Sequence, residues 1–332
     1  PRMSTGVHDP LLSTALFLDN GTTSLVFVAN DALYVTNPVV ASARKRIREM
    51  TGVPEARIML TSTHTHSAPV LRPVDIPYDR PVPDRDYIKR FEDGIVEAAV
   101  TAVRAAQPAE IGFATAHMKG VGTNRRAPDG PADPDVPVLM VRNAETQKPI
   151  AVMVVYAMHP TVLHEDSTLA SADFPGQGRC YLQRHVLGAG CPVLHHNGAS
   201  GNQSPRHCVR AQTFEEAERI GTLYGQAVEK ALEGLAFQSH VILDARQTAV
   251  ANLPIRKFSS LEEAEEKLSQ IKAKFERQKA DGTPRAIVRT TECDVFGAEA
   301  SVRMARAAAD GSLRKAIEAC LPAALQAFRV GE

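Results

Sequence analysis

The first part of the chain shows a pattern of apolar and polar positions that is typical of a β-hairpin. Apolar and polar residues alternate over residues 12–18, and an apolar run follows at residues 24–29. Asn20-Gly21 stands between them, and an Asn-Gly pair between two such runs is a strong signal for a tight turn. Asn37 and Pro38 then predict the start of a helix, with Asn37 as the N-cap and Pro38 in the first turn.

Similar patterns recur along the chain and predict alternating strands and helices. Strand-like apolar runs are bounded by turn residues, while helical stretches repeat apolar residues every three or four positions. Together they predict an α/β fold: a mixed β-sheet flanked by helices, with functional residues at strand ends. The predicted strands are 12–18, 24–29, 58–60, 110–118, 138–141, 150–158, 192–194 and a strand around 240–243, and the predicted helices are 37–52, 86–106, a helix that follows residues 171–176 and ends at 187, 215–234, 259–279 and 313–321.

The chain divides near residue 250, shortly before a highly charged helical stretch. We expect residues 1–250 to form an α/β catalytic domain, and residues 251–332 to form a helical insertion or arm and a continuation of the same domain. Residues 259–279 are highly charged with a narrow apolar stripe. This pattern fits a lid, an arm, a surface helix packed on the body, or a partner-facing helix that would make a homo-oligomer.

Composition excludes several classes of function. The 332 residues include 38 Lys plus Arg and 38 Asp plus Glu, so no basic face for nucleic acid is implied. No apolar run reaches the roughly 20 residues that a transmembrane helix needs. The five cysteines lack a paired pattern, which argues against a disulfide framework and slightly favours a cytoplasmic location. The chain begins at Pro1 and ends as a strand starts near Ala327, so we expect both ends to be cut from a longer protein. Whether that protein begins with a signal peptide is therefore left open.

Two histidines follow the predicted strand 58–60. His64 and His66 stand in the sequence Thr-Ser-Thr-His-Thr-His-Ser-Ala-Pro at residues 61–69. If strand geometry persists through Thr65, both rings point to the same face, where one can bind a metal and the other can transfer a proton. The spacing alone fits equally well a polar strand end with two solvated histidines.

Other polar segments also follow predicted strands or lie in loops. His64 and His159 are the natural pair of zinc ligands, because a catalytic zinc site uses neutral imidazoles and keeps a position open for water. Arg125 could hold a carbonyl oxygen or the oxyanion that develops on it. Asp173 could orient a histidine, and Ser204 could approach a scissile carbonyl. The segments are 63–69, 124–126, 159–160 with 171–173, and 201–205.

In order and spacing, these segments resemble the catalytic domain of the neutral, non-lysosomal ceramidases. The resemblance covers residues 6–206 and rests on THTHSAP, TNRR, YAMHPTVL followed by SADFPG, and NGASGNQSP. It implies a short bacterial relative in lipid or sphingolipid metabolism: a zinc-dependent amidohydrolase that cleaves an N-acyl amide into a fatty acid and an amine. In true ceramidases the amine is sphingosine.

The resemblance also implies roles for single residues. His64 and His159 match the family's zinc-binding histidines, and His66 matches the active-site histidine beside the metal. Arg125 matches the active-site arginine. Ser204 matches the serine near the scissile amide that is sometimes called the nucleophile.

This sequence departs from the family pattern in three places. The family's Gly-Asp-x-Ser-Pro-Asn reads Gly-Asn-Gln-Ser-Pro-Arg at residues 201–206, which puts Asn202 in place of the acid, and His195-His196 stand where small or apolar residues are expected. The family's glutamate and tyrosine zinc ligands, and its C-terminal immunoglobulin-like domain, lie beyond the region that this chain matches. His164, Glu165 and His196 are the candidates here for completing the metal shell.

The proposed chemistry leaves two mechanisms open. In one, zinc activates a water that attacks the amide carbon, and His66 passes a proton to the leaving amine. In the other, Ser204 attacks directly. Two other functions also fit: a metal-dependent amidase or esterase for a small non-lipid substrate, and a non-catalytic relative that kept the fold.

Overall fold

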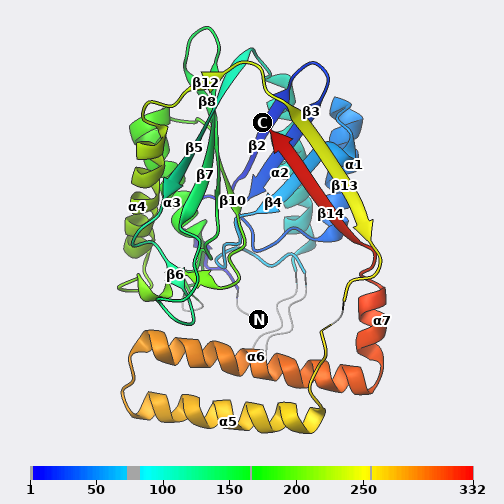
Figure 1. Cartoon of the computed structure of the whole chain (residues 1–332), viewed down its shortest axis with the longest axis vertical. Coiled ribbons are helices and arrows are strands. Elements are labelled where there is room, and N and C mark those ends of the chain that lie inside the picture. Colours follow the sequence, from blue (N-terminus) through cyan, green and yellow to red (C-terminus); the bar gives the residue numbers. More distant parts are fainter. Residues whose placement is uncertain (1–2, 73–82, 165–166, 255, 332) are drawn as a thin grey trace. The chain divides into compact units, whose positions relative to one another are not determined.

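The computed structural model describes residues 3–72, 83–164, 167–254 and 256–331 (Figure 1). The predicted loop at 71–84 therefore lies largely outside the described residues. The contacts divide the chain into two compact units. The first contains Pro1–Arg246 and Phe328–Glu332, and the second contains Gln247–Ala327.

A five-stranded sheet forms the centre of the first unit. Its order is β10-β8-β7-β5-β12, and β10 runs parallel to β8 while the other neighbours pair antiparallel. The strands are β5 (Ala109–His117), β7 (Asp135–Asn143), β8 (Pro149–Tyr156), β10 (Val193–Asn197) and β12 (Phe237–Gln238). This sheet is mixed, as predicted.

A second, three-stranded sheet contains the predicted hairpin. It is formed by β2 (Ser13–Asp19), β3 (Ser24–Asn30) and β4 (Ile58–Ser62), with β3 antiparallel to β2 and parallel to β4. Helix α1 (Asn37–Thr51) makes the crossover between β3 and β4. It begins one residue earlier than predicted, with Thr36 at the N-cap. It ends at Thr51 and is capped by Gly52, whose φ of 78° places it in the left-handed conformation that favours glycine.

The two sheets pack face to face, and helices cover their outer faces (Figure 1). Strand alternation explains these layers, because successive side chains of a strand point to opposite faces. In β3, Leu25 and Phe27 join the core between the sheets, whereas Val26 and Val28 pack under α1 and α2 (Arg85–Arg104). Helices α3 (Asp173–Leu182) and α4 (Phe214–Leu232) cover the five-stranded sheet. The α/β prediction is confirmed, with two facing sheets in place of one.

Short elements complete the first unit. β1 (Gly6–Val7) pairs with β9 (Leu169–Ala170), and β6 (Thr123–Asn124) pairs with β11 (Gln203–Ser204). Single turns occur at η1 (Glu55–Arg57), η2 (Gln183–Leu187) and η3 (Pro205–His207). A further pair, β13 (Leu243–Val250) with β14 (Ala323–Val330), belongs partly to each unit, because the division falls within both strands. The predicted strand around 240–243 was wrong in position, since β13 begins only at Leu243, and β14 begins four residues before Ala327.

The second unit contains α5 (Leu261–Ala280), α6 (Arg285–Ala309) and α7 (Ser312–Glu318). The sequence did not predict α6. Ala264 on the apolar stripe of α5 packs against Val302 and Ala305 of α6. Ion pairs Lys272–Glu299 (2.9 Å) and Arg306–Glu265 (2.6 Å) join the same two helices. At least part of the stripe is therefore covered within the unit.

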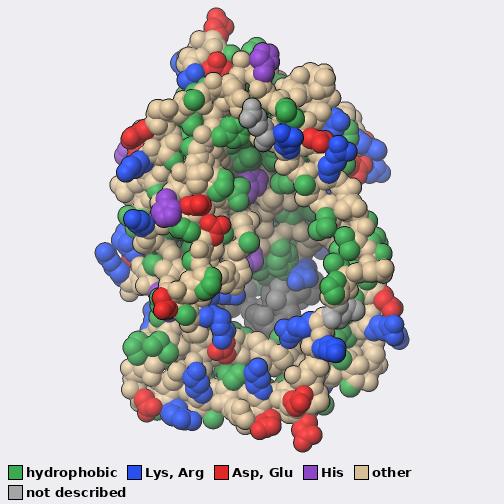
Figure 2. All heavy atoms as spheres, viewed as in Figure 1, with side chains coloured by type: hydrophobic (Ala, Val, Ile, Leu, Met, Phe, Trp, Pro, Cys, Tyr) green, Lys and Arg blue, Asp and Glu red, His purple; other side chains and the backbone are tan. Residues whose placement is uncertain are grey.

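The remaining global expectations concern membranes, charge and cysteines. No helix among the described residues is long and apolar enough to span a bilayer. On the face shown in Figure 2, positive and negative side chains are interspersed. All five cysteines are free thiols, as the absence of a paired pattern predicted.

Candidate metal and catalytic centre

The loop that carries His64 leaves the strand earlier than predicted. β4 ends at Ser62, and the next two residues bond to the last residue of β3 and to the segment after it: Thr63 N donates to Asn30 O (2.9 Å) and His64 N donates to Ala32 O (3.0 Å). His64 adopts a φ of 67°, a left-handed conformation that is uncommon for residues other than glycine. The expectation that strand geometry persists through Thr65 was therefore wrong.

His64 and His159 nevertheless meet, with their Nε2 atoms 3.2 Å apart. Nδ1 of His64 lies 2.8 Å from the carbonyl of Leu33, and Nδ1 of His159 lies 2.9 Å from that of Ser200. Because a carbonyl only accepts, each Nδ1 must carry a proton, and a neutral ring then presents an unprotonated Nε2. Two acceptor lone pairs thus face each other across a short gap.

This arrangement fits a metal ion. Metal-binding histidines usually donate their second ring N–H to a carbonyl or carboxylate, which fixes the tautomer. Two nitrogens bound at about 2.0–2.1 Å in a tetrahedral zinc shell lie roughly 3.3–3.4 Å apart, close to the observed separation. A cation between the rings would also remove the repulsion between the two lone pairs.

His66 lies beside this pair. Its ring is 5.0 Å from that of His64 and 5.8 Å from that of His159. Among the described residues, these three histidines form the group that could hold a metal ion, because one ring nitrogen of each lies within 4.8 Å of the others. Surrounding protein lowers the pKa of His66 to about 3 and that of His159 to about 4, mainly by desolvation. His66 is exposed, so screening by solvent limits the size of its pKa shift. The downward direction of the shift indicates a neutral ring at neutral pH.

Arg125 and Ser204 reach the same region through the β6–β11 pair. Arg125 N donates to Asn202 O (2.7 Å), and His159 N donates to Gln203 O (3.2 Å). The positive charge of Arg125 contributes to the lowered pKa of both His66 and His159. Ser204 is buried, and its Oγ accepts from Arg206 N (3.4 Å) as the cap of η3.

Asp173 contacts the loop that follows His159, and the charge of His164 also acts on its carboxylate. Among the described residues, its carboxylate accepts from the backbone N–H groups of Leu163 (2.9 Å), Phe174 (2.6 Å) and Val162 (3.4 Å). Complete burial raises the pKa of Asp173 to about 6, although these N–H groups favour the charged form. The residue therefore holds the chain that follows His159.

The other candidates for the metal shell were His164, Glu165 and His196. His195 and His196 are buried on opposite faces of β10, with Nδ1 atoms 2.9 Å from Tyr224 OH and 2.6 Å from Thr61 Oγ1. His196, one of the three candidates, is outside the three-histidine group. His164 is close enough for its charge to lower the pKa of His66. Glu165 lies outside the described residues.

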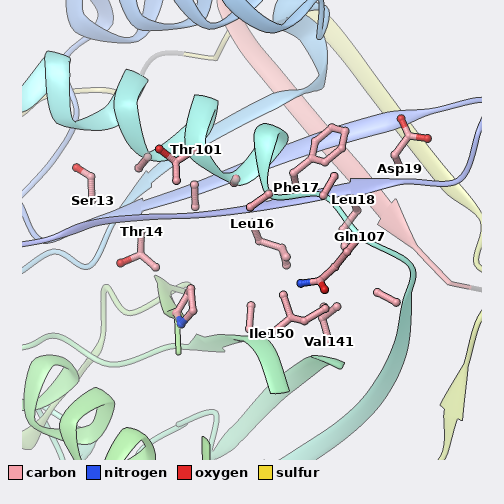
Figure 3. A pocket seen from close by; sticks show the side chains of 18 of the residues that line it. Ser13, Thr14, Leu16, Phe17, Leu18, Asp19, Thr101, Gln107, Val141 and Ile150 are labelled. Carbon is pink, nitrogen blue, oxygen red and sulfur yellow. The ribbon is translucent and has the colours of Figure 1, made fainter. Parts of the chain in front are cut away.

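A large cavity lies apart from the three histidines. Its volume is about 1400 Å³, and it extends between β2, α2 and the five-stranded sheet. Figure 3 shows Leu16 on one side opposite Ile150 and Val141 on the other. His64, His66 and His159 do not line it.

Sequence reasoning missed the backbone carbonyls of Leu33 and Ser200, which accept from the two histidines. The signal in the sequence that could have pointed to them was the change from an apolar strand to polar residues.

The mixed α/β fold and the histidines that follow β4 and β8 define the class of protein, which is an α/β protein with a candidate hydrolase centre. The profile of the family described as neutral/alkaline non-lysosomal ceramidase, N-terminal, matches residues 1–191, more than half of the chain. This chain belongs to that family.

Individual relatives are distant. Neutral ceramidase B of Dictyostelium discoideum is 24% identical over 211 residues, which cover 57% of this chain and 29% of the relative. A solved ceramidase "complexed with C2" is 20% identical with a TM-score of 0.65, covering 75% of this chain and 42% of that one. The neutral ceramidase of Pseudomonas aeruginosa is 20% identical with a TM-score of 0.61, covering 70% and 40%. This chain thus spans less than half of the length of each, and the structural matches establish a shared fold.

Proposed function

We propose that this protein hydrolyses the amide bond of N-acyl lipids of the ceramide type, using a zinc ion held by His64 and His159. The observation that carries the proposal is the pair of facing Nε2 atoms at 3.2 Å, each ring fixed through Nδ1 by a backbone carbonyl. Family membership supports the ceramide-like substrate.

A zinc ion bound there would supply a water of lowered pKa and a Lewis acid. The protein's own residues would complete the reaction. His66, neutral and beside the pair, would take up a proton and deliver it to the nitrogen of the leaving amine. Arg125 would donate hydrogen bonds to the carbonyl oxygen as negative charge develops on it. Water thus adds across the amide bond, giving a carboxylic acid and an amine.

The position of Ser204 favours substrate contact over nucleophilic attack. Its Oγ already accepts a hydrogen bond from Arg206 N in the cap of η3. A serine nucleophile is usually activated by a hydrogen bond to a general base, and the base is usually oriented by a third group. We therefore propose that Ser204 orients the substrate near the histidines.

A substrate comparison tests the proposed function. The full chain, loaded with zinc, is given a fluorescent long-chain N-acyl sphingosine, a short N-acyl amine and a small ester. We expect cleavage of the lipid, loss of that activity in His66→Asn, and retention of it in His117→Asn, a change in an exposed histidine on β5. Preferential cleavage of the short amine or ester would favour a small-molecule hydrolase. No turnover of any of them, with zinc bound, would favour a non-catalytic relative.

A further inference from the structure

The backbone of Ser171 is bonded to the loop that carries His64 and His66. Thr65 lies between the two histidines and is fully buried, and its Oγ1 donates to Ser171 O (2.9 Å). Two residues further on, Ser67 O accepts from Ser171 N (2.9 Å). Residue 171 therefore holds this loop through both its backbone polar groups.

Two residues later, Asp173 holds the loop that follows His159. Its Oδ2 accepts from Leu163 N (2.9 Å) and its Oδ1 from Val162 N (3.4 Å), while Thr161 N donates to His159 O (3.0 Å). Asp173 has a φ of 56°, a left-handed conformation that is unfavourable for a residue with a side chain and persists only where surrounding contacts enforce it.

Asp9 fixes the segment between these two attachment points. Its Oδ2 accepts from Ser171 Oγ (2.5 Å) and its Oδ1 from Ala172 N (2.8 Å). Ser171 Oγ in turn accepts from Asp173 N (3.0 Å). Each residue of the segment 171–173 is thus bonded either to Asp9 or to a group that Asp9 holds.

We propose that residues 171–173, held by Asp9, form a bracket that sets the separation of the His64 and His159 rings. Thr65, Asp9 and Asp173 are positioning residues in this arrangement, because they act on the histidine loops through the bracket. The inference rests on the proposed metal site. A binding site must be held within about 0.5 Å of its productive geometry by its supporting contacts. Loss of such outer contacts typically weakens metal binding about 10–100-fold.

A pair of identical substitutions tests the bracket. Thr65→Val removes the hydroxyl bonded to Ser171, whereas Thr61→Val removes a hydroxyl bonded to His196, four residues earlier in the same segment. The full chains are titrated with Co²⁺ in competition with a chelator, and the visible absorption of the bound ion is recorded. We expect Thr65→Val to weaken binding about 10–100-fold and to change the spectrum. Thr61→Val should leave both unchanged.

Further measurements separate the possible outcomes. Urea unfolding of the metal-free variants shows whether both are folded and similarly destabilised. Asp9→Ala should reproduce the weakened binding, and Asp9→Asn, which keeps one acceptor, should restore part of it. If Thr65→Val and Asp9→Ala bind Co²⁺ with the same affinity and the same spectrum as the wild-type chain, the bracket is overturned. Failure of the wild-type chain to bind either Co²⁺ or Zn²⁺ would instead refute the metal site itself.

Discussion

Nε2 of His64 and Nε2 of His159 face each other at 3.2 Å, although the residues are 95 positions apart in the sequence. Both rings turn their other nitrogen to a backbone carbonyl, at Leu33 and at Ser200. Since each carbonyl requires an N–H donor, the two facing nitrogens are both acceptors. This relationship makes the pair a candidate metal site, and the predictions below start from it.

Arg125→Ala should lower kcat/KM for the lipid substrate by about 10²–10³-fold, mainly through kcat, because a donor to a developing oxyanion is typically worth about 2.7–4 kcal/mol. Steady-state kinetics measures the effect. Arg126→Ala is the matched control, since Arg126 is the exposed neighbour in the same loop. Equal losses in the two variants would remove Arg125 from its proposed role.

Ser204→Ala should reduce activity only roughly tenfold, the effect of losing one hydrogen bond of about 1–1.5 kcal/mol. Mass spectrometry during turnover should detect no acyl adduct on the wild-type chain. If an adduct at Ser204 accumulates and the variant is inactive, the serine is the nucleophile and the water mechanism is wrong.

His195 should make the protein acid-sensitive. Burial lowers the pKa of His195 to about 3, against an ordinary value of 6.5 in the unfolded chain. The unfolded state therefore binds an extra proton below pH 6.5, and the contribution of a neutral His195 to stability is present above that pH and lost as the pH falls towards 3.

Each buried, neutral histidine of this kind steepens the fall in the free energy of unfolding by up to about 1.4 kcal/mol per pH unit. His195→Gln should thus show a shallower loss of unfolding free energy between pH 6 and 4, measured by urea denaturation. Asp173 acts in the opposite direction, because its raised pKa of about 6 favours the protonated folded state as the pH falls through that range. An unchanged slope in His195→Gln would show that the buried ring is not neutral.

Gly221→Ala should destabilise the contact between α3 and α4 by about 1–3 kcal/mol, the usual cost of overpacking. A Cβ there would lie 2.8 Å from Gly178 N and 2.8 Å from Phe174 O, both backbone atoms of α3. Gly297→Ala, on α6, meets nothing within 4 Å and should stabilise its helix by about 0.5–1 kcal/mol. Urea unfolding should show shifts of opposite sign, and equal shifts would contradict the close helix contact.

The sequence was informative where local pattern determines structure. The hairpin at Asn20-Gly21, seven of the strands and six of the helices followed from periodicity and turn residues. Helix α6 was missed because its sequence mixes β-branched residues such as Thr290 and Thr291 with Gly297, which weakens the local helical signal. Its burial against α5 depends on tertiary contact, which a single stretch of sequence does not show.

The candidate site was predictable in its residue types and less so in its geometry. The segments of His64 and His159 stood out because histidines follow apolar strands. The left-handed turn at His64 and the bond from Thr65 to Ser171, 106 residues away, depend on contacts between distant parts of the chain. For the same reason His196 looked like a ligand, although strand alternation turns it towards Thr61 and Phe27.

The zinc content of the purified full chain tests the central claim most directly. The chain is saturated with zinc, dialysed against metal-free buffer and analysed by elemental mass spectrometry, beside His64→Ala and His117→Ala. We expect about one zinc per wild-type chain, retention in His117→Ala and loss in His64→Ala. A wild-type chain without bound zinc, or a His64→Ala variant that retains the same amount, would contradict the assignment of His64 and His159 as metal ligands.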